Sequence, residues 1–293
     1  MAVLENKIDF VGFISVEHAN PNGDPLNGNR PRDTIEGLGE ISDVCIKRKI
    51  RNRLQDMGES IFVQSDDKRT DNYFSLKDRL IADQELKNLS QGSKNDEEKF
   101  KEKACQKWID VRAFGQLFAF SKSKKKNNDN QDDNSVSIGV RGPVSLHPAF
   151  SIEPIEIESI QITKSVNSET ADSRSSDTMG MKHRVKFGVY KLKGSINCQL
   201  AKKTGFSDED AEKIKNALAT LFENDSSAAR PDGSMCVEKL FWFRHNCKSG
   251  KYATAKVHRS VKAETLCDNP RSAGDYRFFY DGSLPGLTPE EVV

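Results

Sequence analysis

The chain lacks the features that mark membrane, secreted and zinc-binding proteins. It contains no uninterrupted apolar run as long as the about 18 residues that indicate a membrane-spanning helix. Its N-terminus shows no basic leader followed by an apolar run and a cleavage site, so we expect a cytoplasmic protein with no membrane partner. Its six cysteines form no Cys-x-x-Cys pair, which argues against a zinc site and a disulfide framework.

An excess of one charge and the common catalytic signatures are also missing. The chain has 45 Lys and Arg against 44 Asp and Glu, so only local patches could indicate a nucleic-acid partner. The sequence "GVRGPVS" matches neither a phosphate-binding nor a dinucleotide-binding loop. His245, Cys247 and His258 lack the spacing of zinc ligands. The residues alone therefore support neither an enzyme nor a cofactor or metal site.

Apolar patterns predict a mixed α+β fold. Strands are expected at 7–17, within 135–166, at 185–200, at 237–245 and at 275–282, and helices after Ser42, within 107–120 and after Ser207. Ser207 and Asp210 form a capping-box pattern, and Ser42 is a plausible N-cap. The order of elements fits a ferredoxin-like or RRM-like sheet with helices on one face. The polar tracts 64–106 and 121–135 are expected to be insertions outside this sheet.

The stretch 19–54 places a basic helix directly behind a loop rich in Asn, Gly and Pro. On the helix, the apolar stripe consists of Ile46, Ile50, Leu54 and Met57, and the surrounding cations are Lys47, Arg48, Lys49, Arg51 and Arg53. No acid lies between Val44 and Gln55 to form the i,i+4 pairs of an ordinary solvated helix. The loop adds Arg30 and Arg32 beside glycines whose backbone N–H groups could approach an anion. The stretch fits a phosphate-binding surface as well as it fits a solvated helix face.

A second basic segment covers 161–186, where Lys164, Arg174, Lys182, His183, Arg184 and Lys186 surround the sequence "TMGM". Gly180 is expected at the tip of a hairpin, because glycine adopts positive φ readily. Met179 and Met181 could then act as apolar wedges between bases. The simpler interpretation is a loop whose methionines pack locally.

Several motifs in one order resemble a known family. "NPNGDPLNGNRPR", "GLGEISDVCIKRKIRN", "DVRAFGQLF", "TMGMKHRV", "FGVYKLKGSI", "KTGFSDEDAEKIKNAL" and "KLFWFRH" are similar to the backbone subunit of the type I CRISPR surveillance complex, Cascade, in its I-B and I-C branch and most closely I-C. The resemblance implies a single right-hand-shaped domain. Its RRM-like palm would cover 7–63, 107–160 and 185–290, its fingers 64–106 and 121–135, and its thumb hairpin 161–186.

The resemblance also implies a function without catalysis. Copies of the subunit would stack along one CRISPR guide RNA, kink it at regular intervals and present it for pairing with a target DNA strand, beside the repeat-processing and large subunits of the complex. Protein would supply shape and charge, while base pairing reads sequence. The implied RNA-binding residues are Asn20, Asn22, Arg30, Arg32, Lys47, Arg48, Lys49, Arg51, Arg141, Lys164, Arg174, Thr178, Met179, Met181, Lys182, His183, Arg184 and Arg230.

Two other functions stay open at this stage. Related backbone subunits of type III complexes cut target RNA with a metal ion and an acidic residue in the loop after the first strand, where this chain has Asp24 and Asp33. A metal-dependent ribonuclease using Asp24 is therefore the main alternative. The third class is a small-molecule enzyme or a scaffold that binds no nucleic acid.

Overall fold

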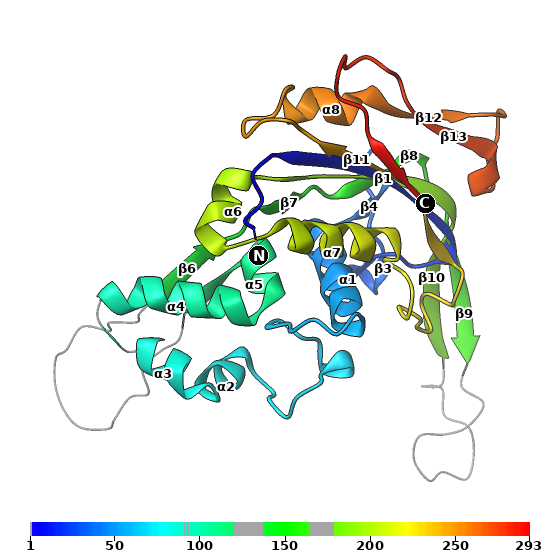
Figure 1. Cartoon of the computed structure of the whole chain (residues 1–293). Coiled ribbons are helices and arrows are strands. Elements are labelled where there is room, and N and C mark those ends of the chain that lie inside the picture. Colours follow the sequence, from blue (N-terminus) through cyan, green and yellow to red (C-terminus); the bar gives the residue numbers. More distant parts are fainter. Residues whose placement is uncertain (1, 91, 93, 120–136, 164–178) are drawn as a thin grey trace, which may run out of the picture.

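The centre of the molecule is an eight-stranded antiparallel sheet (Figure 1). The computed structural model describes residues 2–90, 92, 94–119, 137–163 and 179–293. The hydrogen-bonded path runs through β14 (Glu290–Val292), β11 (Met235–Arg244), β1 (Ile8–Ala19), β10 (Met179–Ile196), β8 (Ala149–Pro154) and β4 (Leu38–Ile41). β7 (Val144–Leu146) and β9 (Ile157–Thr163) also pair with β10. The fold is thus a mixed α/β architecture around one sheet, and the strands expected at 7–17 and 237–245 are confirmed.

β1 is the most buried strand because both of its faces are covered. Residues 8–14 are all buried, as expected for a central strand with β10 and β11 on either side. β10 is longer than the segment predicted at 185–200, since it begins at Met179 and ends at Ile196. Asn197 stops the strand by capping α6 (Cys198–Thr204), its Oδ1 accepting from Gln199 N at 2.8 Å.

Two helices, α1 (Asp43–Asp56) and α7 (Asp208–Ala219), cover one face of the sheet. The Ser42 side chain caps α1 and Ser207 closes a capping box with Asp210, so both predicted N-termini are confirmed. Ile46, Ile50 and Leu54 are fully buried in the core below α1. Met57 is 37% exposed, and it lies at the C-cap beyond the helix. The expected stripe therefore ends at Leu54.

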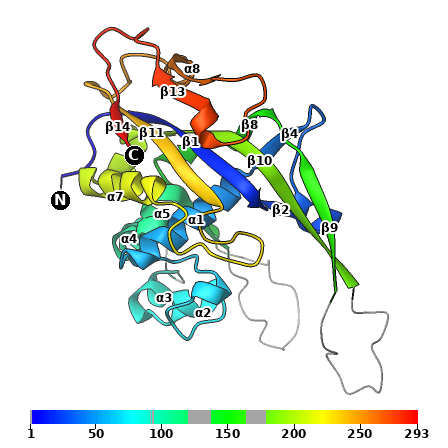
Figure 2. The ribbon, with the colours of Figure 1, turned by 90° about the vertical axis from the view of Figure 1, so that its right-hand side faces the viewer.

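The opposite face of the sheet is covered by the C-terminal segment (Figures 1 and 2). This cover contains α8 (Thr254–Ser260) and a separate two-stranded sheet of β12 (Val261–Thr265) and β13 (Tyr276–Tyr280). Its core combines Phe13 and Phe243 of the main sheet with Val257 and Val261 of the cover. The strand expected at 275–282 is thus confirmed as β13, whereas α8 and β12 were not predicted.

The described residues within 62–141 form a smaller body below the helices (Figure 1). Its elements are η2 (Asp66–Lys68), α2 (Leu76–Ile81), α3 (Gln84–Ser90), α4 (Lys94–Lys107), α5 (Ile109–Phe114), β5 (Gly115–Ala119) and β6 (Ser137–Arg141). It has its own apolar cluster around Phe62, Phe100, Trp108 and Phe118. The helix expected within 107–120 ends at Phe114, because Gly115 has φ 79° and turns the chain into β5.

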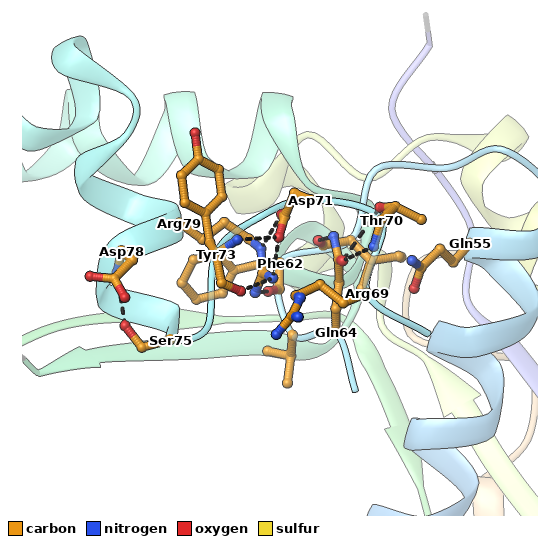
Figure 3. Close-up of polar contacts among 12 residues, drawn as sticks. Gln55, Phe62, Gln64, Arg69, Thr70, Asp71, Tyr73, Ser75, Asp78 and Arg79 are labelled. Carbon is orange, nitrogen blue, oxygen red and sulfur yellow. Dashed lines mark hydrogen bonds and ion pairs between the residues drawn. The ribbon is translucent and has the colours of Figure 1, made fainter. Parts of the chain in front are cut away.

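Arg79 holds the irregular part of this smaller body together (Figure 3). Its guanidinium donates to both carboxylate oxygens of Asp71, at 2.6 and 2.8 Å, and to the Phe62 carbonyl at 2.8 Å. The Tyr73 carbonyl accepts a further bond at 3.3 Å. This fork geometry suits arginine, and it fixes a loop that contains no regular hydrogen-bonded ladder.

Within the described residues, no helix combines the length and the apolar character needed to cross a membrane.

Candidate nucleic-acid interface

The Asn- and Gly-rich loop after β1 is held in place by its own amide side chains. Asn20 is only 3% exposed, and its Nδ2 donates to the Asn29 carbonyl at 2.7 Å. Asn22 Oδ1 accepts from the backbone N and the Oγ of Ser42, at 2.9 and 2.7 Å. These contacts close the loop onto the N-terminus of α1. The two asparagines predicted to bind RNA therefore point into the protein and position the loop.

Gly23 leaves room for the Asn29 side chain within this loop, where it lies in β2 (Gly23–Asp24) opposite β3 (Arg30–Pro31). A Cβ atom on Gly23 would lie 1.9 Å from Asn29 Oδ1. Gly28 ends the short η1 turn (Pro25–Asn27) with φ 57°. Gly28 thus allows the chain to turn at the loop tip, which is exposed from Pro25 to Asn29.

Arg30 connects this loop to a projecting ribbon formed by β9 and the first half of β10. Its Nη1 donates to Ser159 Oγ at 3.3 Å, and Ser159 Oγ lies 2.8 Å from His183 Nδ1. Arg32 lies beside Asp24, with 3.6 Å between Nη2 and Oδ1. Arg30 and His183, both predicted to bind RNA, are therefore brought together on one face of the ribbon.

The ribbon extends from the sheet beyond the neighbouring strands (Figures 1 and 2). Met179 and Met181 are 61% and 54% exposed, and the strand alternation puts them on the same face as His183. Gly180 pairs with Ile162 inside β10, so the expected tip position for this glycine is wrong. The predicted residues Lys164, Arg174 and Thr178 lie outside the described residues.

Lys182 and Arg184 lie on the opposite face of the ribbon. Arg184 Nε donates to Glu158 Oε2 at 2.8 Å, which neutralises its charge. Lys182 lies opposite Ile160 in the register, and within the described part of the chain its side chain has no hydrogen-bond or ion-pair partner. Ile160 and Ile162 are also exposed on this ribbon. The sequence analysis did not single them out as candidate contact residues. The alternation in "IESIQIT" was the signal that could have revealed them.

The cations of α1 do not form an open basic surface, because protein groups bind all of them and distant acids bind three: Lys49, Arg51 and Arg53. Asp225 accepts from Lys49, which is only 4% exposed. Asp110 Oδ2 accepts from Arg51 Nε at 2.9 Å. Burial lowers the pKa of Lys49, and the nearby Asp225 opposes this shift. Sequence spacing could not reveal these two acids, which lie 176 and 59 residues away from their partners.

The remaining α1 cations are also engaged. Lys47 Nζ lies 3.0 Å from Asp43 Oδ2, one turn back along the helix. Arg48 Nη1 donates to the Val63 carbonyl at 2.8 Å. Arg53 binds Glu223 and donates to Thr220 Oγ1 at 2.7 Å. The absence of acids between Val44 and Gln55 therefore does not leave the α1 cations free.

Two further predicted residues lie in different settings. Arg230 Nε donates to Asp225 Oδ2 at 3.1 Å, the same carboxylate that binds Lys49. The Ala229 carbonyl accepts from Asn20 N at 2.9 Å, so Arg230 lies beside the loop. Arg141 is exposed at the end of β6, in the smaller body and separate in sequence and contacts from the loop and the ribbon.

The acidic residue of the ribonuclease alternative has a structural role in the loop. Asp24 Oδ1 accepts from Leu26 N at 3.2 Å, which caps η1, and it also faces Arg32. Across the described ranges, no group of three His, Cys, Asp or Glu residues is arranged to hold a metal ion. His245, considered as a zinc ligand, instead lies 2.8 Å from Asp9 through its Nε2.

Comparison with known proteins identifies the family. A model described as "CRISPR-associated protein Cas7" matches residues 6–281. A CRISPR-associated protein Cas7 from Haloferax volcanii is 27% identical over 260 residues, which cover 84% of this chain and 72% of that protein.

The comparison with solved structures shows a similar fold in one case. A chain of a "CRISPR RNA-guided surveillance complex, pre-nicking" has a TM-score of 0.50 at 12% identity, covering 86% of this chain and 81% of its own. A chain of a "CRISPR RNA-guided surveillance complex" has a TM-score of 0.42 at 14% identity, covering 81% and 68%. Because the family model spans most of the sequence, the chain belongs to the Cas7 family of CRISPR-associated proteins.

Proposed function

We propose that this chain is the guide-RNA-binding backbone subunit of a type I CRISPR surveillance complex. The observation that supports this most directly is the projecting ribbon, which exposes Met179 and Met181 beside Arg30 and His183. Apolar side chains on such a ribbon can insert between bases, while adjacent cations bind phosphates. Family membership supports the same function.

In this proposal the main sheet and its helices are an RRM-like palm. Residues 64–106 and 121–135 are the fingers, and 161–186 are the thumb that kinks the guide. Copies of the chain polymerise along the guide RNA and leave the stretches between kinks free to pair with a target DNA strand. The subunit is not catalytic and assembles with the repeat-processing and large subunits. The similarity to type I-C remains a prediction.

In this proposal the predicted RNA-binding residues divide into those that contact phosphates directly and those that support the interface indirectly. We assign the direct phosphate contacts to Arg30 and, on the opposite face of the ribbon, to Lys182, with the exposed Arg141 as a further candidate. Arg32 and Arg230 pair with acids, so they bind RNA only if they exchange these partners for phosphates. Arg48, Lys49 and Arg51 support the interface indirectly, because their protein partners occupy their charged groups. Asn20 and Asn22 act by holding the loop in shape.

The test is purification with and without a repeat-containing guide RNA, followed by sizing and absorbance at 260 and 280 nm. We expect RNA to co-purify and to shift the protein into a large species. In a salt titration, each phosphate that is no longer bound reduces the slope for single-stranded RNA by about 0.7. The Arg30→Ala/Lys182→Ala variant, which removes two such contacts, should show a slope reduced by about 1.4 for every guide sequence.

The matched control is Lys99→Ala/Lys103→Ala on α4, which removes the same charge at two exposed positions. It should bind RNA like the wild type. Protein that emerges free of RNA and ignores added guide at low salt would exclude the proposed function. If the protein cuts a complementary RNA in the presence of magnesium and Asp24→Ala abolishes the cutting, the ribonuclease function would be correct instead.

A further inference from the structure

A basic stretch without acids runs from β11 into the C-terminal cover. From Lys239 to Ala263 the sequence contains seven Lys and Arg residues and no Asp or Glu in 25 positions. Three of these cations have acidic partners: Lys239 pairs with Glu291, Arg244 with Asp208 and Glu212, and Lys262 with Asp281. The remaining four are Lys248, Lys251, Lys256 and Arg259.

These four residues are exposed, and within the described part of the chain none has an acidic partner. We call the segment 248–259 the α8 strap. Lys256 and Arg259 occupy the exposed face of α8, while Val257, His258 and Ser260 are buried below. The His258 ring is fixed by a 2.9 Å contact between Nε2 and the Gly194 carbonyl. The strap is therefore anchored to the main sheet and directs its cations outward.

Tyr252 organises two of the lysines. Lys251 Nζ and Lys256 Nζ lie 5.9 and 5.1 Å from the centre of its ring, within the range of cation–π attraction. The Tyr252 hydroxyl donates to the Pro285 carbonyl at 2.9 Å. The ring thus holds two ammonium groups close together on the same strap, and its own polar group is already satisfied.

Lys191 of β10 lies at the end of the strap, where its Nζ donates to the Val261 carbonyl at 2.5 Å. Burial lowers the pKa of Lys191 to about 8, with smaller contributions from Lys193 and Lys262. Burial also lowers the pKa of His258, so this histidine is neutral at pH 7 and adds no charge. The positive charge of the strap therefore comes from Lys248, Lys251, Lys256 and Arg259.

We propose that the α8 strap binds the phosphate backbone of a nucleic-acid duplex. Lysines spaced along a surface recognise phosphates without reading bases. Proteins that bind single strands usually add exposed aromatic rings for stacking, and the Tyr252 ring is already engaged by lysines. A duplex, whose bases are already stacked, needs only charge.

This surface is separate from the proposed guide-binding ribbon. In Figures 1 and 2, α8 lies at the top of the molecule and the ribbon extends toward the bottom. The duplex would therefore contact a different face from the one that holds the guide. Because the two surfaces share no residues, each can be removed without the other.

The test is the charge-reversal variant Lys251→Glu/Lys256→Glu, measured with short labelled DNA and RNA duplexes at several salt concentrations. We expect weaker duplex binding and, for DNA, a salt slope reduced by about 1.8, that is about 0.9 for each phosphate no longer bound. Binding of single-stranded guide RNA should not change. Weaker binding of the DNA duplex alone would show that the strap prefers DNA. Weaker binding of both duplexes would show that it accepts either nucleic acid.

The matched control is Lys99→Glu/Lys103→Glu, which changes net charge equally at exposed positions of α4. Equal duplex affinity for Lys251→Glu/Lys256→Glu and the wild type would overturn the proposal, and so would an equal loss in the control. Polyglutamate serves as a further probe, for an acidic protein partner. If the strap variant binds polyglutamate more weakly but binds both duplexes like the wild type, the duplex proposal fails. The guide-RNA measurement separates any of these results from failure of the proposed function.

Discussion

Helix α1 and the α8 strap both carry basic residues with no acid between them, but their electrostatic environments are opposite. In α1, each cation from Lys47 to Arg53 binds a protein group, and four of them bind carboxylates. In the strap, four cations have no acidic partner among the described residues. The difference lies in what the fold brings to each segment. Acids from two other segments of the chain surround α1, whereas aromatic and apolar groups support the strap.

This comparison shows why a run of positive charge is a weak predictor of a binding surface. A buried carboxylate and an arginine that neutralise each other contribute little to an outside field, although they cost much stability when one is removed. An exposed, unpaired lysine contributes little to stability and much to the field. Mutations in α1 should therefore mainly lower stability, whereas mutations in the strap should mainly weaken the binding of anions.

The largest effect is expected at Asp110, which is fully buried. Its carboxylate accepts from Arg51 Nε at 2.9 Å and from the backbone N of Phe62 and Val63 at 2.8 and 3.1 Å. Asp110→Ala removes all three bonds and leaves Arg51 without its acid, so we expect a loss of about 3 to 5 kcal/mol in the free energy of unfolding. Urea unfolding measures this loss.

A loss below about 1 kcal/mol would be that of an ordinary surface pair. It would contradict the conclusion that the α1 pairs are important for stability. Lys251→Ala/Lys256→Ala is the matched variant in the strap. It should leave the urea midpoint unchanged within the error, because no carboxylate loses a partner there.

A smaller effect is expected from acid. Burial alone would raise the pKa of Asp210, but the hydrogen bonds from Arg112, at 2.7 and 2.8 Å, and from Ser207 hold it below its usual value. A lowered pKa in the folded state stabilises the protein above the pKa of the unfolded carboxyl, and this contribution is lost as pH falls through the folded pKa. Each unit of difference corresponds to about 1.4 kcal/mol.

Unfolding free energies measured from pH 6 downward should therefore fall in the wild type and fall less steeply in Asp210→Asn. The strap variant Lys251→Ala/Lys256→Ala should follow the wild-type curve, since its lysines contact no titrating acid. A strap variant with a flatter acid limb would show that an acid is paired there after all.

The local features of the sequence predicted the elements well. Ser42 and Ser207 cap the expected helices, and the apolar runs of β1 and β11 lie in the sheet, because caps and buried strands depend on residues close in sequence. The partners of Lys49 and Arg51 were invisible, since Asp225 and Asp110 approach only after the chain has folded.

The same limit explains what sequence reasoning missed at the candidate sites. The hydrogen bonds of Asn20 and Asn22 within the loop could not be predicted, because they depend on Asn29 and Ser42 approaching after folding. The α8 strap did not stand out because Lys248, Lys256 and Arg259 are scattered through ordinary local sequence, and only the absence of nearby acids distinguishes them.

The smallest effect is expected at Lys47, whose pair with Asp43 is partly exposed and lies one helical turn apart. Lys47→Ala should cost about 0.3 to 0.5 kcal/mol in urea unfolding, as other i,i+4 surface pairs do. Its guide-RNA affinity and salt slope should match the wild type, because Asp43 already neutralises the ammonium group. A salt slope reduced by about 0.7 would mean that Lys47 exchanges Asp43 for a phosphate on binding. In that case α1 would form part of the RNA surface despite its internal pairs, and the contrast with the strap would hold only for the RNA-free protein.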